Sequence, residues 1–494
     1  MNILFITPEM LPYAKTGGLA DVCGSLPWTL VQLGLQVRSI MPLYKAIDRQ
    51  RFKMKLIIKD LAVSLGGETI KANIFSHEPF PEHLVYFVEC ERFFARSELY
   101  TTKEGDYPDN DLRFIFFQRV SLEFFKRIGL KPDIIHCHDW QTALVPVYLK
   151  TLYRNDPFYS RTRSILTIHN LAYQGLFPKE HFPLTGLDWS EYNIEGLEFW
   201  GKVNFLKGGI IYSHALTTVS PHYAQEIQTP EFGCGLDGVL KKRQKDLYGI
   251  INGLDYHYWN PKTDRELKAR YSVKSIWKKR INKSALQQEQ GLEEDPEIFL
   301  IGMITRLADQ KGLDITLKAL KGLMEEKIQL VILGTGDERY HRLFQELSKK
   351  YPGKIGINLK FDAPLSKRIY AGSDAFLMPS RYEPCGLGQL ISLRYGTVPI
   401  VRATGGLIDT VSDFDPATGK GNGIVFREYS SQALLKAVER ALYFYSQKRL
   451  WRNLVKTGMR EDFSWTNSAR HYLTLYQKYL KVEEVHSKSI VNSQ

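Results

Sequence analysis

The sequence predicts an α/β protein with two domains, each built around a doubly wound parallel sheet. Short apolar runs recur along the chain, and many of them end in a glycine-rich or polar loop that precedes a helical pattern. The string Thr-Gly-Gly-Leu occurs twice, at 16–19 and at 404–407, each time between a strand and a helix. A chain of 494 residues is too long for one compact core, so we expect two domains or three.

The composition, 44% hydrophobic and 24% charged residues, is that of an ordinary globular protein. The formal net charge of +12 favours anionic ligands, and the basic residues are scattered. A phosphorylated small molecule fits this pattern better than a nucleic acid, although a solvated basic surface would also account for it. Five widely spaced cysteines without a CxxC pair predict reduced thiols and a cytoplasmic location. We expect no membrane partner, because no apolar run approaches the ~20 residues of a span.

The first domain is expected to begin with a strand over 2–7 and a glycine loop that leads into a helix. Gly17 and Gly18 carry no side chains, so backbone N–H groups there can approach a diphosphate, and Lys15 adds a mobile positive charge. The loop is neither a Walker motif nor GxGxxG, and a flexible turn with a surface lysine explains it as well. After a strand at 36–41, the segment 53–90 has the alternation of hairpins and is predicted to be an insertion.

Two later strands of this domain, 133–137 and 164–168, end in polar residues. His138 and Asp139 follow the first strand, and His169 follows the second. Because the carboxyl ends of parallel strands meet at one edge of a sheet, we expect these side chains to line a ligand site. Metal binding is the other candidate, but the spacing fits no HxxxH-type pattern.

The second domain is expected after a polar crossover near 259–282. Its first strand, 298–302, leads into a loop that contains Arg306 and Lys311, two fixed cations that can neutralise a diphosphate leaving group without a metal. A solvated surface ion pair is the alternative. A further strand at 330–333 precedes a Gly-Thr-Gly loop, which alone is weak evidence for a nucleotide.

The stretch 375–396 places one carboxylate between a buried strand and a helix. Pro379 ends the strand, and Gly386-Leu387-Gly388 opens the helix. Glu383 lies on the turn and is expected to face the reacting part of a ligand whose phosphates rest on the helix, although it could simply cap that helix. The pattern from 431 to 480 is helical.

Seven motifs, in this order, resemble the bacterial glycogen synthase and plant starch synthase family, over nearly the whole chain from residue 2 to about 480. They are Lys15-Thr16-Gly17-Gly18-Leu19, His138-Asp139-Trp140, His169 to Gly175, Asn252-Gly253, Arg306 with Lys311, Arg381 to Leu387, and Thr404 to Leu407. The resemblance implies the GT-B fold, in which two Rossmann-like domains face a deep interdomain cleft and the C-terminal helix crosses back to the first domain. The implied domains are 1–247 with the helix 463–482, and 248–462, followed by a disordered tail at 483–494.

The resemblance also implies glucosyl transfer from ADP-glucose to the non-reducing 4-hydroxyl of an α-1,4-glucan such as glycogen, with retention of configuration and without metal or cofactor. Arg306 and Lys311 would stabilise the departing ADP phosphates, and Glu383 would hold the glucose hydroxyls. His169 would bind the sugar, and Asp139 would line the acceptor side. The remaining substrate-binding residues would be Lys15, Gly17, Gly18, Asp21, Asn252, Gly336, Phe361, Cys385, Gly386 and Leu387.

Some features leave alternatives open. Gln141 stands where many bacterial members have histidine, and Gly388 replaces a threonine often found there. A related GT-B enzyme that uses UDP-glucose or another acceptor is one alternative, and a non-enzymatic glucan-binding protein is another. A transient covalent adduct is a rival to same-face attack guided by the leaving group. The DxD-like triplets 109–111 and 413–415 lie in turn-like contexts, which favour a structural role. The sequence does not predict an oligomeric state.

Overall fold

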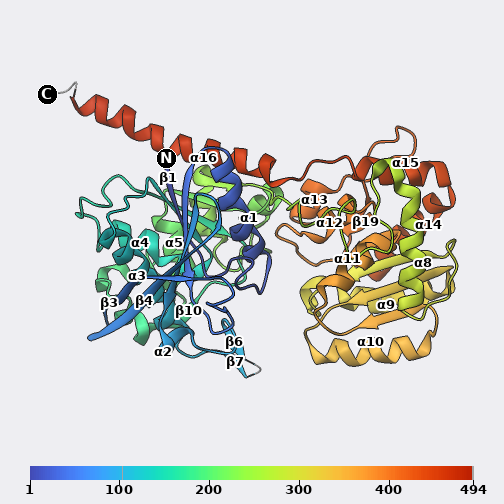
Figure 1. Ribbon diagram of the computed structural model, residues 1–494, viewed down its shortest axis with the longest axis horizontal. Helices are drawn as coiled ribbons and strands as arrows, with labels where there is room; N and C mark the ends of the chain where they lie inside the picture. The colour runs from blue at the N-terminus through green and yellow to red at the C-terminus, as the bar shows by residue number, and fades with distance from the viewer. Residues whose placement is uncertain (103, 492–494) are drawn as a thin grey trace. The chain divides into compact units, whose positions relative to one another are not determined.

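The computed structural model describes residues 1–102 and 104–491 and contains two compact units (Figure 1). The first unit comprises Met1–Gly253 together with the chain from Trp465 on, and the second comprises Leu254–Ser464. The first boundary lies a few residues beyond the expected position at 247, because strand β14 (Leu247–Gly249) pairs with β13 in the sheet of the first unit. Each unit has the predicted α/β class.

A nine-stranded sheet forms the centre of the first unit. All neighbouring strands from β14 to β5 are parallel, whereas β4 is antiparallel to both of its neighbours. In spatial order the strands are β14, β13 (Ala215–Thr218), β9 (Arg163–Ile168), β8 (Ile134–His138), β1 (Asn2–Ile6), β2 (Gln36–Pro42), β5 (His83–Glu89), β4 (Glu68–Phe80) and β3 (Lys55–Leu65).

The hairpins predicted over 53–90 are present, but the interpretation of the whole segment as an insertion is wrong. β5 pairs in parallel with β2 and so belongs to the main sheet. Its alternate residues Val85 and Phe87 are buried, and so are Tyr86 and Val88. A strand that is covered on both faces is typical of the interior of a sheet, and only β3 and β4 extend beyond it.

Helices cover both faces of this sheet. α1 (Gly18–Gln32) and α16 (Trp465–Val491) share one apolar cluster, in which Val22 and Leu26 of α1 lie with Tyr472 and Tyr476 of α16. The C-terminal helix therefore returns to the first unit, as expected. The tail predicted to be disordered from 483 is helical as far as Val491, and residues 492–494 lie outside the described residues. Other helices that pack on the sheet include α3 (Asn110–Arg127), α4 (Leu144–Lys150) and α6 (Pro221–Glu226), and α5 (Phe205–Tyr212) packs against α4.

The second unit contains a six-stranded sheet in which all pairs are parallel. β15 lies between β16 and β18, so the chain adds strands first on one side of β15 and then on the other side. Such a reversal of strand order is the point at which open α/β sheets bind ligands. In spatial order the strands are β17 (Ile355–Asn358), β16 (Ile328–Leu333), β15 (Phe299–Ile304), β18 (Ala375–Met378), β19 (Val398–Arg402) and β20 (Ile424–Phe426).

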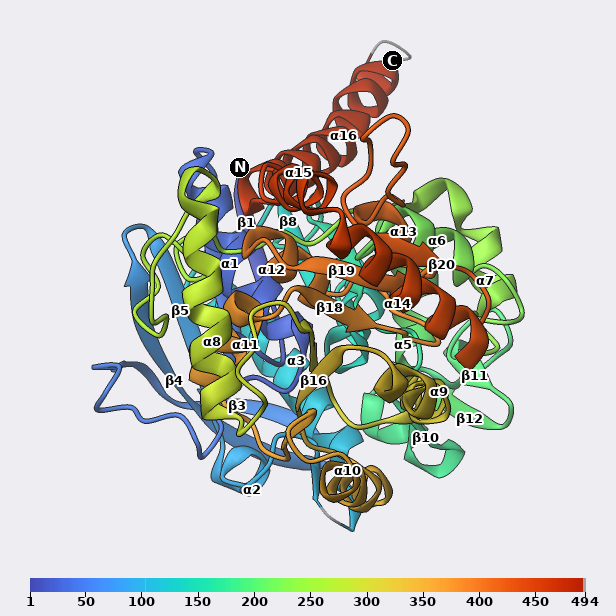
Figure 2. The same ribbon diagram turned by 90° about the vertical axis from the view of Figure 1, so that its right-hand side faces the viewer.

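Figure 2 shows α8 (Lys279–Glu289) beside α11 (Ala363–Gly372), and α9 (Leu313–Glu325) beside α14 (Ser431–Ser446) across the second sheet from them. The expected helix after the Gly-Leu-Gly turn is α12. The remaining helices of this unit include α10 (Glu338–Lys350), α12 (Gly388–Arg394), α13 (Gly406–Thr410) and α15 (Lys448–Gly458). The described helices include none with both the length and the apolar character of a membrane span.

Candidate active site

Every predicted site residue lies after the carboxyl end of a parallel strand of its own unit. In the first unit these residues follow β1, β8, β9 and β14, and in the second they follow β15, β16, β17 and β18. In each sheet two of the loops flank a reversal of strand order, between β1 and β8 in the first unit and between β15 and β18 in the second. The strand ends thus assemble each set of polar side chains at one edge of its sheet.

An ion pair between Lys311 and Glu383 is the centre of the second unit's site. The Lys311 Nζ lies 2.7 Å from the Glu383 Oε2, which also accepts a hydrogen bond from the Ser380 hydroxyl at 2.9 Å. Glu383 is 6% exposed, and the Lys311 side chain is 18% exposed. A buried carboxylate with two donors is held in one orientation, and its ammonium partner is fixed with it.

The loops after β15 and β18 are packed backbone to backbone. Gly312 has φ of 69°, and a Cβ on it would lie 2.0 Å from the carbonyl oxygen of Pro379. The Gln310 carbonyl accepts a hydrogen bond from the Arg381 N–H at 2.8 Å, and the Gln310 amide donates to the Tyr382 carbonyl at 3.2 Å. Only glycine fits at 312 without displacing the second loop, so the position of Lys311 is tied to that of Glu383.

Arg306 lies on the same loop as Lys311 but is exposed. Its guanidinium Nη2 lies 3.4 Å from the Gln310 Oε1. The loop after β15 therefore carries one exposed cation, Arg306, and one largely buried cation, Lys311.

The repeat of Thr-Gly-Gly-Leu favours a glycine-rich anion loop in each half of the chain, but in the second string the Gly406 amide is used inside the protein. Gly405 has φ of 45°, and the Gly406 N–H donates to the Glu383 carbonyl at 3.0 Å. A Cβ on Gly406 would lie 2.3 Å from the carbonyl oxygen of Cys385. The loop supports the backbone of the Glu383 turn, because its amide is already used inside the protein.

The Glu383 turn continues through Cys385, Gly386 and Leu387. Cys385 is 4% exposed, and its carbonyl accepts a hydrogen bond from the Gln389 amide at 2.9 Å. Gly386 has φ of 73°, a left-handed conformation that favours glycine, and Leu387 precedes α12 as its N-cap. The turn thus leads directly into the helix, as predicted.

Phe361 and Gly336 belong to neighbouring loops of the second sheet. Phe361 is 83% exposed and directly precedes Asp362, the N-cap of α11. Gly336 forms a β-bridge with Leu307, so the loop after β16 runs beside the loop that carries Arg306. An aromatic ring so exposed is available for stacking on a planar ligand group.

The glycine loop of the first unit is open. A Cβ on Gly17 or on Gly18 would meet nothing within 4 Å, so a ligand can approach this backbone. Lys15 and Asp21 form an ion pair at 2.7 Å across the loop. Burial raises the pKa of Asp21, and the Lys15 ammonium opposes that shift.

Sequence reasoning missed the residue that shapes this loop, Glu9. Its carboxylate accepts hydrogen bonds from the Thr16 N–H at 2.5 Å and the Thr16 hydroxyl at 2.6 Å. The Tyr100 hydroxyl donates to the same carboxylate at 2.8 Å, and Glu9 is 3% exposed. A carboxylate directly after the first strand, seven residues before Thr16, is the signal that could have indicated it.

His169 and Asp139 contact one another through the backbone. The Asp139 Oδ1 accepts a hydrogen bond from the His169 N–H at 2.7 Å. Asp139 has φ of 57° and ψ of −173°, a region that is essentially restricted to glycine and that recurs at functional sites. Burial raises the pKa of Asp139 to about 8, although the hydrogen bond from His169 opposes the shift, and burial lowers the pKa of His169 to about 3.

Asn252 follows β14 and is 4% exposed. Its Oδ1 is buried without a hydrogen-bond partner among the described residues. A buried amide oxygen of this kind is a candidate acceptor for a ligand.

Aspartates of the two DxD-like triplets form ion pairs with other side chains of the protein, which supports a structural role for the triplets. In the described part of the chain, no group of three or more His, Cys, Asp or Glu residues is arranged to hold a metal ion. The triplet carboxylates form ion pairs: Asp109 with Arg96 at 2.6 Å, Asp111 with His181 at 2.5 Å, and Asp413 with Arg440 at 2.6 Å.

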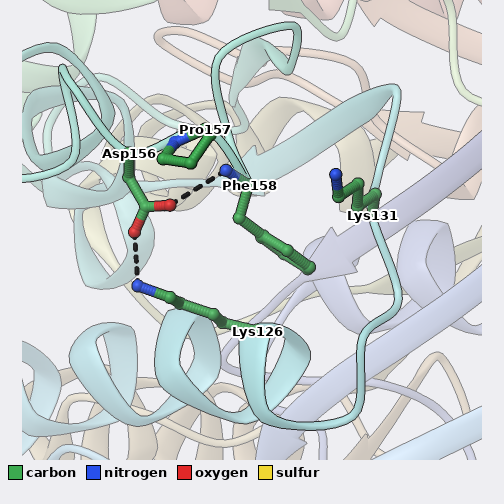
Figure 3. Close-up of a pocket in the computed structure, with 5 residues that line it drawn as sticks. All are labelled: Lys126, Lys131, Asp156, Pro157 and Phe158. Carbon is green, nitrogen blue, oxygen red and sulfur yellow. Dashed lines mark hydrogen bonds and ion pairs between the residues drawn. The ribbon is translucent and has the colours of Figure 1, made fainter.

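Figure 3 shows a surface hollow of the first unit that contains none of the predicted site residues. The Lys126 ammonium pairs with Asp156 at 2.5 Å, and the Phe158 N–H donates to the same carboxylate at 2.9 Å. The Asp156 carboxylate thus accepts from both Lys126 and Phe158. Its lining residues are Lys126, Lys131, Asp156, Pro157 and Phe158.

Two parallel-sheet units with glycine loops and fixed charges at their strand ends define a glycosyltransferase of the GT-B class, and two family models agree. The model for the starch synthase catalytic domain matches residues 2–242, and that for glycosyl transferases group 1 matches residues 282–453. The chain belongs to the glycogen synthase and starch synthase family. It is accordingly a glucan synthase that uses a nucleotide-sugar donor and a glucan acceptor.

Individual relatives match over nearly their full length. The glycogen synthase of Pseudothermotoga lettingae is 49% identical over 98% of this chain and 100% of its own, and that of Thermotoga maritima is 47% identical over 97% and 99%. The catalytic domain of starch synthase IV from Arabidopsis thaliana, solved with ADP and acarbose, has a TM-score of 0.90 at 36% identity and covers 97% of this chain and 99% of its own. Sucrose-phosphate synthase from Thermosynechococcus elongatus, at 17% identity and a TM-score of 0.59, over 97% of this chain and 99% of its own, shares the fold.

Proposed function

We propose that this glucan synthase transfers glucose from ADP-glucose to the non-reducing 4-hydroxyl of an α-1,4-glucan, with retention of configuration and without a metal. The observation that carries the proposal is the 2.7 Å pair of Lys311 and Glu383, with Arg306 on the same loop. ADP as the nucleotide is supported by the related starch synthase IV domain, which was solved with ADP and acarbose.

Charge development explains why such a site suits glycosyl transfer. Cleavage of the bond between glucose and diphosphate makes the sugar more positive and the diphosphate more negative. Arg306 and Lys311 would stabilise the departing phosphates, which is the role of a divalent metal in other transferases. Because these cations are part of the loop before the reaction starts, little reorganisation is needed in the transition state.

Glu383 would accept hydrogen bonds from the glucose hydroxyls, while Lys311 shares its charge between the carboxylate and the leaving diphosphate. The backbone of Gly386 and Leu387 at the start of α12 would bind the sugar and phosphate, with Cys385 in the same turn. We favour attack by the acceptor on the face that the diphosphate leaves, guided by the leaving group itself.

The other predicted residues complete the assignment. Lys15, Gly17 and Gly18 would contact the diphosphate, supported by the open backbone at both glycines. Asp21 would hold Lys15 in place through their ion pair. The remaining roles are Phe361 and Gly336 toward the nucleotide, Asn252 and His169 toward the sugar, and Asp139 toward the acceptor.

Glucose transfer to glycogen from radiolabelled donors tests the proposal. We expect kcat/KM for ADP-glucose to exceed that for UDP-glucose by at least about tenfold. An exoamylase that cleaves only α-1,4 bonds from the non-reducing end should release the label. Faster transfer from UDP-glucose, or label that resists the exoamylase, would contradict the proposal.

We also propose a cytoplasmic location, supported by five free cysteines of which four are buried.

A further inference from the structure

A buried histidine contacts the ring of His169. The Nδ1 of His138 lies 3.0 Å from the Nε2 of His169, and His138 is fully buried. The ring of His138 stacks on Phe5, with centroids 5.3 Å apart, and lies 4.4 Å from the ring of His136. The second ring nitrogen of His138, Nε2, is buried without a hydrogen-bond partner among the described residues.

The hydrogen bond between the two rings is compatible with two combinations of neutral histidine tautomers. In one, Nδ1–H of His138 donates to Nε2 of His169, and the orphaned Nε2 of His138 carries no hydrogen. In the other, Nε2–H of His169 donates, and His138 must then bury an unpaired N–H. Orphaned buried N–H donors are rarer than orphaned acceptors, so the first arrangement is favoured.

We propose that His138 is a positioning residue for glucosyl transfer: it donates its Nδ1–H to His169 and so fixes the tautomer in which His169 offers Nδ1–H to the sugar. The inference rests on the proposed role of His169. The Asp139 Oδ1 accepts a hydrogen bond from the His169 backbone N–H at 2.7 Å, so His169 is oriented both through its ring and through its backbone.

The fixed tautomer suits a reaction in which positive charge develops on the sugar. Burial lowers the pKa of His169 to about 3, so the imidazole is neutral at physiological pH. A neutral N–H donates a hydrogen bond to a sugar oxygen without placing a cation beside the anomeric carbon. The opposite tautomer would offer that oxygen a bare nitrogen and lose the hydrogen bond.

Two variants whose side chains both branch at Cγ, as histidine does, test the donor role of His138. His138→Asn places an amide nitrogen where Nδ1 lies and keeps a donor, whereas His138→Leu has the same branching and no donor. We expect kcat of H138L to fall about 100-fold with little change in donor KM, and kcat of H138N to stay within about tenfold of wild type. Wild-type kcat in H138L, or an equal fall in both variants at unchanged melting temperature, would overturn the proposal.

A second measurement does not depend on the folding of any position-138 variant. Nitrogen NMR of wild-type protein labelled with 15N-histidine, with the signals of His169 assigned by comparison with His169→Asn, reports which nitrogens carry protons. The proposal requires a protonated Nδ1 and a bare Nε2 in His169. A bare Nδ1, or protons on both nitrogens, would refute it.

Turnover of His169→Ala, compared with that of H138L, distinguishes a failure of this inference from a failure of the proposed function. If His169→Ala keeps wild-type turnover, the role of His169 toward the sugar is wrong, whatever its tautomer. If His169→Ala loses turnover but H138L does not, His169 acts on the sugar and the role of His138 is wrong.

Discussion

The Lys311 ammonium lies 2.7 Å from the Glu383 carboxylate, across 72 residues of sequence. The loops that carry them follow β15 and β18, the neighbouring strands where the order of the second sheet reverses. Gly312 packs directly on Pro379 and couples these loops. The pair is therefore part of the fold itself, and a donor would meet charges that are already in place.

Replacement of Lys311 by alanine should lower turnover about 100-fold or more, because the leaving diphosphate loses a fixed cation and Glu383 loses its partner. Steady-state transfer to glycogen measures the effect, and circular dichroism checks the fold. Lys327→Ala is the matched control, because it breaks an ion pair with Asp295 of the same 2.7 Å length at an exposed position. Near wild-type turnover in the Lys311 variant, or an equal loss in the control, would show that the cation has no special role.

Two glycine substitutions should have opposite effects on stability and binding. Gly312→Ala should lower the melting temperature, because its Cβ would lie 2.0 Å from the Pro379 carbonyl at φ of 69°, at a cost of about 1–3 kcal/mol. Gly18→Ala has open space around its Cβ and should leave the melting temperature unchanged while it raises the donor KM. Calorimetry measures the two melting temperatures, and kinetics at varied donor concentration measures KM. An unchanged melting temperature in Gly312→Ala, or a lowered melting temperature with an unchanged donor KM in Gly18→Ala, would contradict the loop assignments.

Stability should depend on pH through Asp139. Its folded-state pKa is raised to about 8 from an ordinary value of 3.8, so between these values the folded state keeps a proton that the unfolded state has lost. Its contribution to stability is complete below the unfolded pKa and is lost as pH rises toward the folded pKa. The free energy of unfolding of wild type relative to Asp139→Asn should fall by at least about 1 kcal/mol from pH ~5 to pH ~8. Urea titrations at each pH measure this difference in the free energy of unfolding. A difference that stays constant or grows as the pH rises would rule out the buried, protonated carboxyl.

Much of the fold could be predicted because the strands are apolar runs bounded by turn residues. The strand 375–378 has the predicted bounds, and α1 begins at the glycine loop. The segment 53–90 was misjudged, because alternation predicts hairpins but does not reveal that β5 pairs with the distant β2. Pairing between strands far apart in sequence depends on tertiary packing, which local pattern does not encode.

The candidate site was predicted residue by residue, but its contacts were not. The two Thr-Gly-Gly-Leu strings are identical in sequence, yet Gly17 and Gly18 have open space around them, whereas the Gly406 amide donates to the Glu383 carbonyl. Glu9 was missed because its contact with Thr16 depends on how the loop after β1 folds back, and the contact of His138 with His169 was missed because it joins groups on different strand ends. Such contacts follow from strand order, which becomes apparent only in the structure.

Glucose transfer from labelled ADP-glucose to glycogen in the presence of a metal chelator tests most directly whether fixed cations replace a metal at the leaving diphosphate. We expect wild-type protein to incorporate label at an unchanged rate when the chelator is added, and Lys311→Ala to incorporate it at least about 100-fold more slowly. Transfer that stops with the chelator and returns with a divalent metal, or that proceeds equally fast in Lys311→Ala, would contradict the account.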